Sequence, residues 1–198
     1  MTEPTDPELR SPRTAPPLVG AARPASVGTR GFLFADLRDY TSYVDTHGDR
    51  AAAALLDRYR TSVRSAVALA RGAEIRTEGD SFYVVFESVS DAVYCGLAIV
   101  EAAGATADGP ADPIHVGVGV HAGETIETAE GFVGSAVNIA ARLCAEAMAG
   151  ELVVSDTVRA LTRTSVEVGF ETGGRPLPRL RDPRRLRLRR PIRLVGTS

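Results

Sequence analysis

Lysine and tryptophan are absent from this sequence of 198 residues, so all of its 23 basic residues are arginine. Only two cysteines occur, Cys95 and Cys144, and neither stands in a CxxC or metal-type spacing. We therefore expect reduced thiols in the core rather than a disulfide framework or a zinc site. The sequence also has no signal-peptide pattern and no apolar run long enough to span a bilayer, which predicts a soluble, cytoplasmic protein without a membrane partner.

Aromatic residues are scarce, at 6% of the chain, so the core must consist mainly of Ala, Val, Leu and Ile. The length suffices for one domain with a sizeable core. Residues 1–29 contain six prolines and almost no periodic apolar residues, which predicts a disordered leader. Residues 30–198 are expected to form the domain.

The apolar pattern changes from a period of two to a helical period several times along this domain. Strands are predicted at 31–37, 73–78, 81–87, 114–124 and 151–156, helices at 49–71, from 90 to about 100 and at about 135–148, and then a short helix and a terminal β-hairpin. This order is typical of an α+β, ferredoxin-like βαββαβ sandwich with a C-terminal β-hairpin. We expect the helices to cover one face of a mainly antiparallel sheet. The Gly79-Asp80 turn would then lie beside the end of the first strand.

This arrangement is expected to bring the carboxylates of Asp36 and Asp80 together. Asp36 ends a buried strand, where an unpaired charge costs desolvation energy. With no lysine in the chain, and with Arg38 expected on the opposite face of the strand, a divalent cation is the simplest partner. Oxygen ligands without His or Cys suit Mg²⁺ or Mn²⁺ better than Zn²⁺. The alternative is that Asp36 caps the next helix and Asp80 is a plain turn residue, and spacing alone leaves both open.

Three segments occur in a definite order: FADLRDYTSY, GDSFYVVF and GFVGSAVNIAARL. Together they resemble the catalytic domain of the class III nucleotidyl cyclases, from about residue 31 to residue 156. The resemblance implies that Asp36 and Asp80 hold two ions, Mn²⁺ or Mg²⁺, with the backbone carbonyl of Leu37. It implies that Asn138 orients the ribose and that Arg142 meets the charge growing on the α-phosphate, and their i, i+4 spacing puts both on one helix face.

The resemblance also implies the reaction and the assembly. The 3′-oxygen of a nucleoside triphosphate would attack the α-phosphorus in line, releasing pyrophosphate and a 3′,5′-cyclic nucleotide, while the loop from Leu37 to Thr41 offers backbone N–H groups to the phosphates. In this family the metal pair and the Asn/Arg pair come from opposite subunits of a head-to-tail dimer. The chain is therefore expected to be a homodimer with two shared sites.

Several positions depart from the pattern of cyclases that use ATP. Those enzymes read adenine with a Lys and with an Asp or Thr, where this chain has Arg76 and Gly131. Asp39 stands in place of the family's Gly and is expected to face solvent or to cap the helix. Tyr40 stands in place of its Phe, and either packs in the core or narrows the base pocket. The altered pocket resembles the pyrimidine cyclases of bacterial antiphage systems, which favours UTP, with CTP possible; an adenylate cyclase making cAMP is the alternative.

Two hypotheses belong to other classes of protein. A catalytically inactive nucleotide-binding module should have lost one of the acids or the Asn/Arg pair, and this chain keeps all four. Nine arginines against one acid in residues 175–193 suggest nucleic-acid binding, but their alternation with leucines is equally typical of a solvated hairpin, so no nucleic-acid partner is expected. His47, His115 and His121 lack metal-type spacing and are interpreted as packing or surface residues.

Overall fold

The computed structural model describes residues 28–105, 112–128, 131–167, 170–173 and 185–188. Their helices and strands, in chain order, are β1 (Gly28–Leu37), α1 (Tyr40–His47), α2 (Asp49–Leu69), β2 (Ala73–Glu78), β3 (Ser81–Phe86), α3 (Val89–Ala105), β4 (Val116–Thr128), β5 (Gly131–Val133), α4 (Ser135–Glu146), β6 (Glu151–Ser155), α5 (Asp156–Thr162), β7 (Phe170–Gly173) and β8 (Arg185–Leu188).

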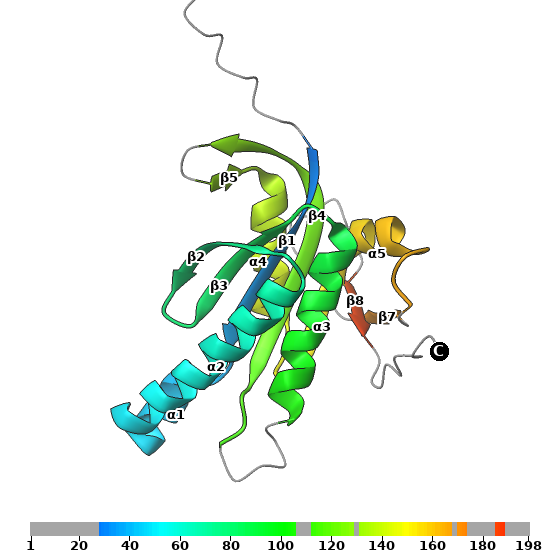
Figure 1. Ribbon diagram of the computed structural model, residues 1–198. Coiled ribbons are helices and arrows are strands. Elements are labelled where there is room, and N and C mark those ends of the chain that lie inside the picture. Colours follow the sequence, from blue (N-terminus) through cyan, green and yellow to red (C-terminus); the bar gives the residue numbers. More distant parts are fainter. Residues whose placement is uncertain (1–27, 106–111, 129–130, 168–169, 174–184, 189–198) are drawn as a thin grey trace, which may run out of the picture.

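The described strands form one eight-stranded sheet in the order β2-β3-β1-β4-β6-β8-β7, with β5 paired to the end of β4 (Figure 1). β4 and β6 are parallel, and the other described pairs are antiparallel. The first four strands have the βαββαβ order, so the predicted α+β sandwich is confirmed. β7 and β8 also pair as the predicted terminal hairpin.

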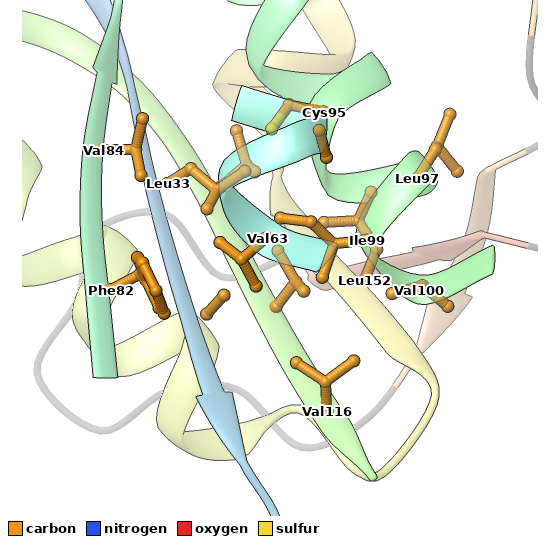
Figure 2. Close-up of a cluster of buried hydrophobic side chains, with 14 of the residues drawn as sticks. Leu33, Val63, Phe82, Val84, Cys95, Leu97, Ile99, Val100, Val116 and Leu152 are labelled. Carbon is orange, nitrogen blue, oxygen red and sulfur yellow. The ribbon is translucent and has the colours of Figure 1, made fainter. Parts of the chain in front are cut away.

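The main core lies between the sheet and the pair α2 and α3 (Figure 2). Leu33 from β1, Val84 from β3 and Val116 from β4 meet Val63 of α2 and Ile99 of α3, and all five are at most 2% exposed. These side chains are aliphatic, as the low aromatic content predicts. Cys95 and Cys144 are free and buried, and burial raises the pKa of both thiols, so the expectation of inert core thiols agrees with their surroundings.

The expectation that the helices cover one face of the sheet is wrong, because α4 lies on the opposite face from α2 and α3 (Figure 1). Val118 and Val120 of β4 point into the main core. The alternate positions are Gly117, Gly119, His121 and Gly123. A Cβ on Gly119 would lie 2.1 Å from the backbone nitrogen of Cys144, and one on Gly123 would lie 2.9 Å from Cβ of Ala136. Alternation along the strand thus gives β4 one valine face and one glycine-rich face, and α4 packs on the glycine-rich face.

The element boundaries differ from the sequence prediction in three places. An additional helix, α1, precedes α2 and is separated from it by Gly48, whose φ of 79° interrupts the helical path. β4 continues to Thr128 and pairs with β5, where only a Gly-rich connection was expected. β1 begins at Gly28, so the last two residues of the predicted leader belong to a strand. The rest of that leader lies outside the described residues.

None of the described helices is both long enough and apolar enough to cross a bilayer.

Candidate active site

The turn between β2 and β3 carries Asp80 and lies against the end of β1, where Asp36 stands. The hydroxyl of Ser81 donates to Oδ1 of Asp36 at 2.5 Å. Burial raises the pKa of Asp80, and the charge of Asp36 raises it further, while Arg38 and Arg60 partly offset the shift. The two carboxylates are therefore electrostatic neighbours, as the strand order predicts.

Arg38 lies on the same side of β1 as Asp36, and the expectation that it points to the other face is wrong. Residues two apart on a strand share a face, and the backbone N–H of Arg38, just after β1, still donates to the carbonyl of His115 beside β4 at 2.7 Å. Nη1 of Arg38 is 2.8 Å from Oδ2 of Asp36 and 3.3 Å from the carbonyl oxygen of Leu37. Asp36 thus has a cationic partner within its own chain.

The donors at this end of the sheet fit a magnesium or manganese ion. They are two carboxylates and the carbonyl of Leu37, all hard oxygens. The described residues contain no cluster of three or more His, Cys, Asp or Glu, so an ion held here would take its further ligands from water or phosphate oxygens. The hydroxyl of Tyr59 is buried and has no hydrogen-bond partner among the described residues. Burial raises its pKa strongly, and the charges of Asp36 and Asp80 add to that shift, so an unsatisfied donor belongs to the same neighbourhood.

Asn138 and Arg142 lie one turn apart on the exposed side of α4. The opposite side of this helix packs on the sheet through Ala136, Ala140, Leu143 and Cys144. The side chains of Asn138 and Arg142 make no hydrogen bond or ion pair with another described residue, and Arg142 is not among the charges that shift the pKa of Asp80. One chain therefore does not bring the Asn/Arg pair and the acid pair into one cluster.

The first turn of α1 shows how the loop after β1 is built. Asp39 has φ of 59°, a left-handed conformation that favours glycine and that Asp tolerates. Its side chain is exposed and makes no capping hydrogen bond, so only the solvent-facing interpretation is confirmed. Tyr40 packs against the main core, and its hydroxyl donates to the carbonyl of Ala52 at 3.5 Å. Packing accounts for Tyr40, whereas Thr41 is exposed and remains a candidate for phosphate contact.

The two positions expected to read the base lie in one region, although they are far apart in the sequence. Gly131 begins β5 with φ of 119°, and a Cβ there would lie 3.1 Å from Cγ2 of Ile75. Ile75 is next to Arg76, whose exposed guanidinium is 3.4 Å from Oε1 of Glu78. Because L side chains rarely adopt that φ, a plain substitution at Gly131 would not restore an Asp or Thr reader in a relaxed backbone.

Sequence reasoning missed or misplaced three residues that surround the acids. Ser81 could have been found, since it follows Asp80 and strand pairing places it opposite Asp36. Arg38 was assigned to the wrong face. Arg60 donates to the carbonyl of Gly79 at 2.6 Å, and it gave no signal because it looks like any exposed helical arginine.

Two of the three histidines, His47 and His115, line a pocket at the end of β1 together with Leu37, Arg38 and Asp39. His47 is exposed and stacks on Tyr43, His115 is exposed, and His121 is buried with Nδ1 2.7 Å from the hydroxyl of Ser155. These surroundings agree with packing and surface roles. Within the Arg-rich stretch only β8 is described, paired to β6 and β7.

Comparison with known proteins identifies the class. The family model described as "Adenylate and Guanylate cyclase catalytic domain" matches residues 24–175, and the chain belongs to this family. It is 28% identical over 144 residues to a "Putative adenylate cyclase 3" of Rhizobium meliloti (strain 1021), a match that covers 72% of this chain. The matched segment is only 24% of the length of that relative.

Solved structures of cyclases share the fold. The "Adenylate/Guanylate Cyclase/Hydrolase" from Silicibacter pomeroyi superposes with a TM-score of 0.70 at 27% identity, covering 83% of this chain and 97% of the other. The adenylyl cyclase CyaB from P. aeruginosa superposes with a TM-score of 0.74 at 19% identity, covering 87% and 99%. The second likeness is one of fold alone.

Proposed function

We propose that the chain is a nucleotidyl cyclase that converts a nucleoside triphosphate to a 3′,5′-cyclic nucleotide and pyrophosphate. The observation that carries the proposal is the juxtaposition of Asp36 and Asp80 at one end of the sheet, in a member of the cyclase family. Two ions, Mn²⁺ or Mg²⁺, bound at these carboxylates would acidify the 3′-hydroxyl and neutralise the triphosphate.

The residues of the chain have separate tasks in this proposal. Asp36, Asp80 and the carbonyl of Leu37 hold the ions. Asn138 orients the ribose, and Arg142 donates to the α-phosphate as negative charge grows on it. Thr41 and the backbone N–H groups at the start of α1 bind and orient the phosphates.

The exposed position of Asn138 and Arg142 supports a homodimer. Their side chains are free to act on a substrate held by another subunit, and one chain does not join them to its own acids. A second copy of the chain would complete each of two sites. Residues 30–198, extended by Gly28 and Thr29 at the start of β1, would form the catalytic domain of each subunit.

For the substrate we propose UTP, with CTP possible, and a role of the product as a second messenger in antiphage defence. Support comes from Arg76 and Gly131, because a planar guanidinium and a missing side chain cannot reproduce the usual adenine contacts. The similarity to a putative adenylate cyclase favours the second candidate, an adenylate cyclase that makes cAMP with relaxed base contacts.

The test incubates the purified chain with each of the four nucleoside triphosphates and Mn²⁺ and identifies the products by mass spectrometry. Cyclic UMP as the main product supports the leading proposal, and cyclic AMP alone supports the second. Asp36→Ala should abolish every product, whereas the exposed control Asp57→Ala should retain full activity. Full activity of Asp36→Ala would contradict the site.

A further inference from the structure

The guanidinium of Arg38 lies between the acid end of β1 and the C-terminal end of α4. Nε donates to the carbonyl of Ala147 at 2.8 Å, and Nη2 donates to the carbonyl of Cys144 at 2.5 Å. Nη1 donates to Oδ2 of Asp36 and to the carbonyl of Leu37. All three nitrogens are therefore engaged, and the side chain is only 17% exposed.

The two sides of this guanidinium have different partners. The carbonyls of Cys144 and Ala147 belong to the last turn and the C-cap of α4, and that of Cys144 also accepts the N–H of Ala147. The C-terminal end of a helix favours a positive charge. Nη1 instead contacts Oδ2 of Asp36 and the carbonyl of Leu37, two oxygens assigned above to the divalent ions.

The fold reserves space for this arrangement. A Cβ on Gly117 of β4 would lie 2.4 Å from Nη2 and 2.6 Å from Nε of Arg38, so only glycine leaves room for the guanidinium against the strand. Unlike a surface salt bridge, the contact is held by packing on one side and by two carbonyls on another.

We propose that Arg38 is an internal counter-cation that occupies the Asp36 half of the metal site and competes with the divalent ion for its oxygens. The inference rests on the proposed function, since it concerns the same metal site. When an ion binds, Nη1 gives up Oδ2 of Asp36 and the carbonyl of Leu37, while Nε and Nη2 stay on α4. Without nucleotide, Asp36 and Asp80 then bind divalent ions weakly. With a bound triphosphate, which supplies more negative charge, they bind the ions strongly.

The experiment measures Mn²⁺ affinity of the nucleotide-free protein by electron paramagnetic resonance, together with Tm. Arg38→Gln removes a full charge a few ångströms from the ion, so its Mn²⁺ affinity should be tighter by roughly tenfold. Arg38→Lys is the matched control: it keeps the charge but cannot reach both carbonyls of α4. It should lose stability as Arg38→Gln does, with Mn²⁺ affinity within about threefold of the wild type.

Unchanged or weaker Mn²⁺ affinity in folded Arg38→Gln would overturn the inference, and so would equal tightening in both variants, because loosening of α4 would then explain it. Asp36→Asn separates this failure from failure of the proposed function. If Asp36→Asn binds Mn²⁺ as well as the wild type does, or if the wild type and Arg38→Gln both fail to bind, the metal site itself is wrong.

A measurement on the wild type covers the case in which the variants do not fold. On addition of Mg²⁺, the ¹⁵N resonance of Arg38 Nη1 should shift or broaden while that of Nε stays in place. No change in Nη1 at saturating Mg²⁺ would contradict the competition.

Discussion

The ionised side chain of Asp80 destabilises the folded chain. Its carboxylate is partly buried and lies near the carboxylate of Asp36, and both effects favour the protonated form. The guanidinium groups of Arg38 and Arg60 offset only part of this cost. The folded chain without ions therefore carries an unfavourable charge, and ions bound at the proposed site would offset its cost.

We expect Asp80→Asn to stabilise the ion-free protein at neutral pH and to abolish its activity. The pKa of Asp80 is raised above 3.8 in the folded state, so the folded chain holds this proton more tightly than the unfolded chain does. Stability is thus lost as the pH rises through the raised pKa, and Asn avoids that loss. In EDTA at pH 7, Tm should rise by roughly 2 °C, because solvent screens the pair and about 1 kcal/mol has that effect at this length.

The same experiment contains its own control. The gain in Tm should shrink as the pH falls through the raised pKa and toward about 3, where the wild-type carboxyl is mostly protonated in both states. A gain that is constant with pH would show that the charge of Asp80 is not the cause.

Arg142, unlike Asp80, has an exposed side chain that does not contribute to the stability of the described chain. Arg142→Ala should leave Tm unchanged and lower kcat about 100-fold, since one charge-stabilising donor contributes about 3 kcal/mol in transition states. Arg159→Ala, an exposed arginine of α5, is the control and should leave kcat unchanged. Equal kcat values for the two variants would contradict the assigned role of Arg142.

At the scale of an element, β4 explains how α4 comes to lie at the active end of the sheet. The glycines of its glycine-rich face let the helix backbone approach the strand directly, and the C-terminal end of the helix then reaches Arg38. The valines of the other face fill the main core. One face of β4 thus packs the core of the domain, and its other face positions α4, the helix that carries Asn138 and Arg142.

Gly119→Ala tests this close approach. The added methyl group would lie 2.1 Å from the backbone nitrogen of Cys144, and backbone cannot move aside as a flexible side chain can. The free energy of unfolding in urea should fall by about 3 kcal/mol. Gly28→Ala is the control, because nothing lies within 4 Å of its Cβ, and its stability should change by less than about 0.5 kcal/mol. A loss below 1 kcal/mol for Gly119→Ala would mean that α4 shifts freely.

The apolar periodicity of the sequence predicts where helices and strands lie, but it does not predict which face of the sheet a helix covers. The long helix α2 and the strands β1, β2 and β3 were predicted to within a few residues, because each carries its own apolar pattern. The face occupied by α4 was predicted wrongly. A helix shows which of its sides is apolar, but the glycine face that receives this side belongs to another part of the chain.

For the whole molecule, the separation of the acid pair from the Asn/Arg pair is the property with the clearest consequence. If two chains complete each site, variants with different defects should complement one another. Mixing Asp80→Ala with Arg142→Ala in equal amounts gives heterodimers in half of the dimers, and each heterodimer has one intact site of two. After exchange of subunits, activity should recover to about a quarter of the wild-type value, from near zero for either variant alone.

Recovery should depend on subunit exchange. Mixing variants whose subunits have been cross-linked beforehand should give no recovery, and the absence of recovery after proven exchange would exclude the shared site.

The sequence alone determined the order of the elements apart from α1 and β5, and it singled out the two acids, because hydrophobic period and turn chemistry are local properties that residues carry with them. Tertiary structure decided what those acids meet. The contact of Arg38 with both Asp36 and α4, the opposite face taken by α4, and the meeting of Gly131 with β2 all join distant segments. Such contacts depend on which surfaces pack together in three dimensions, and no local pattern in the chain encodes that choice.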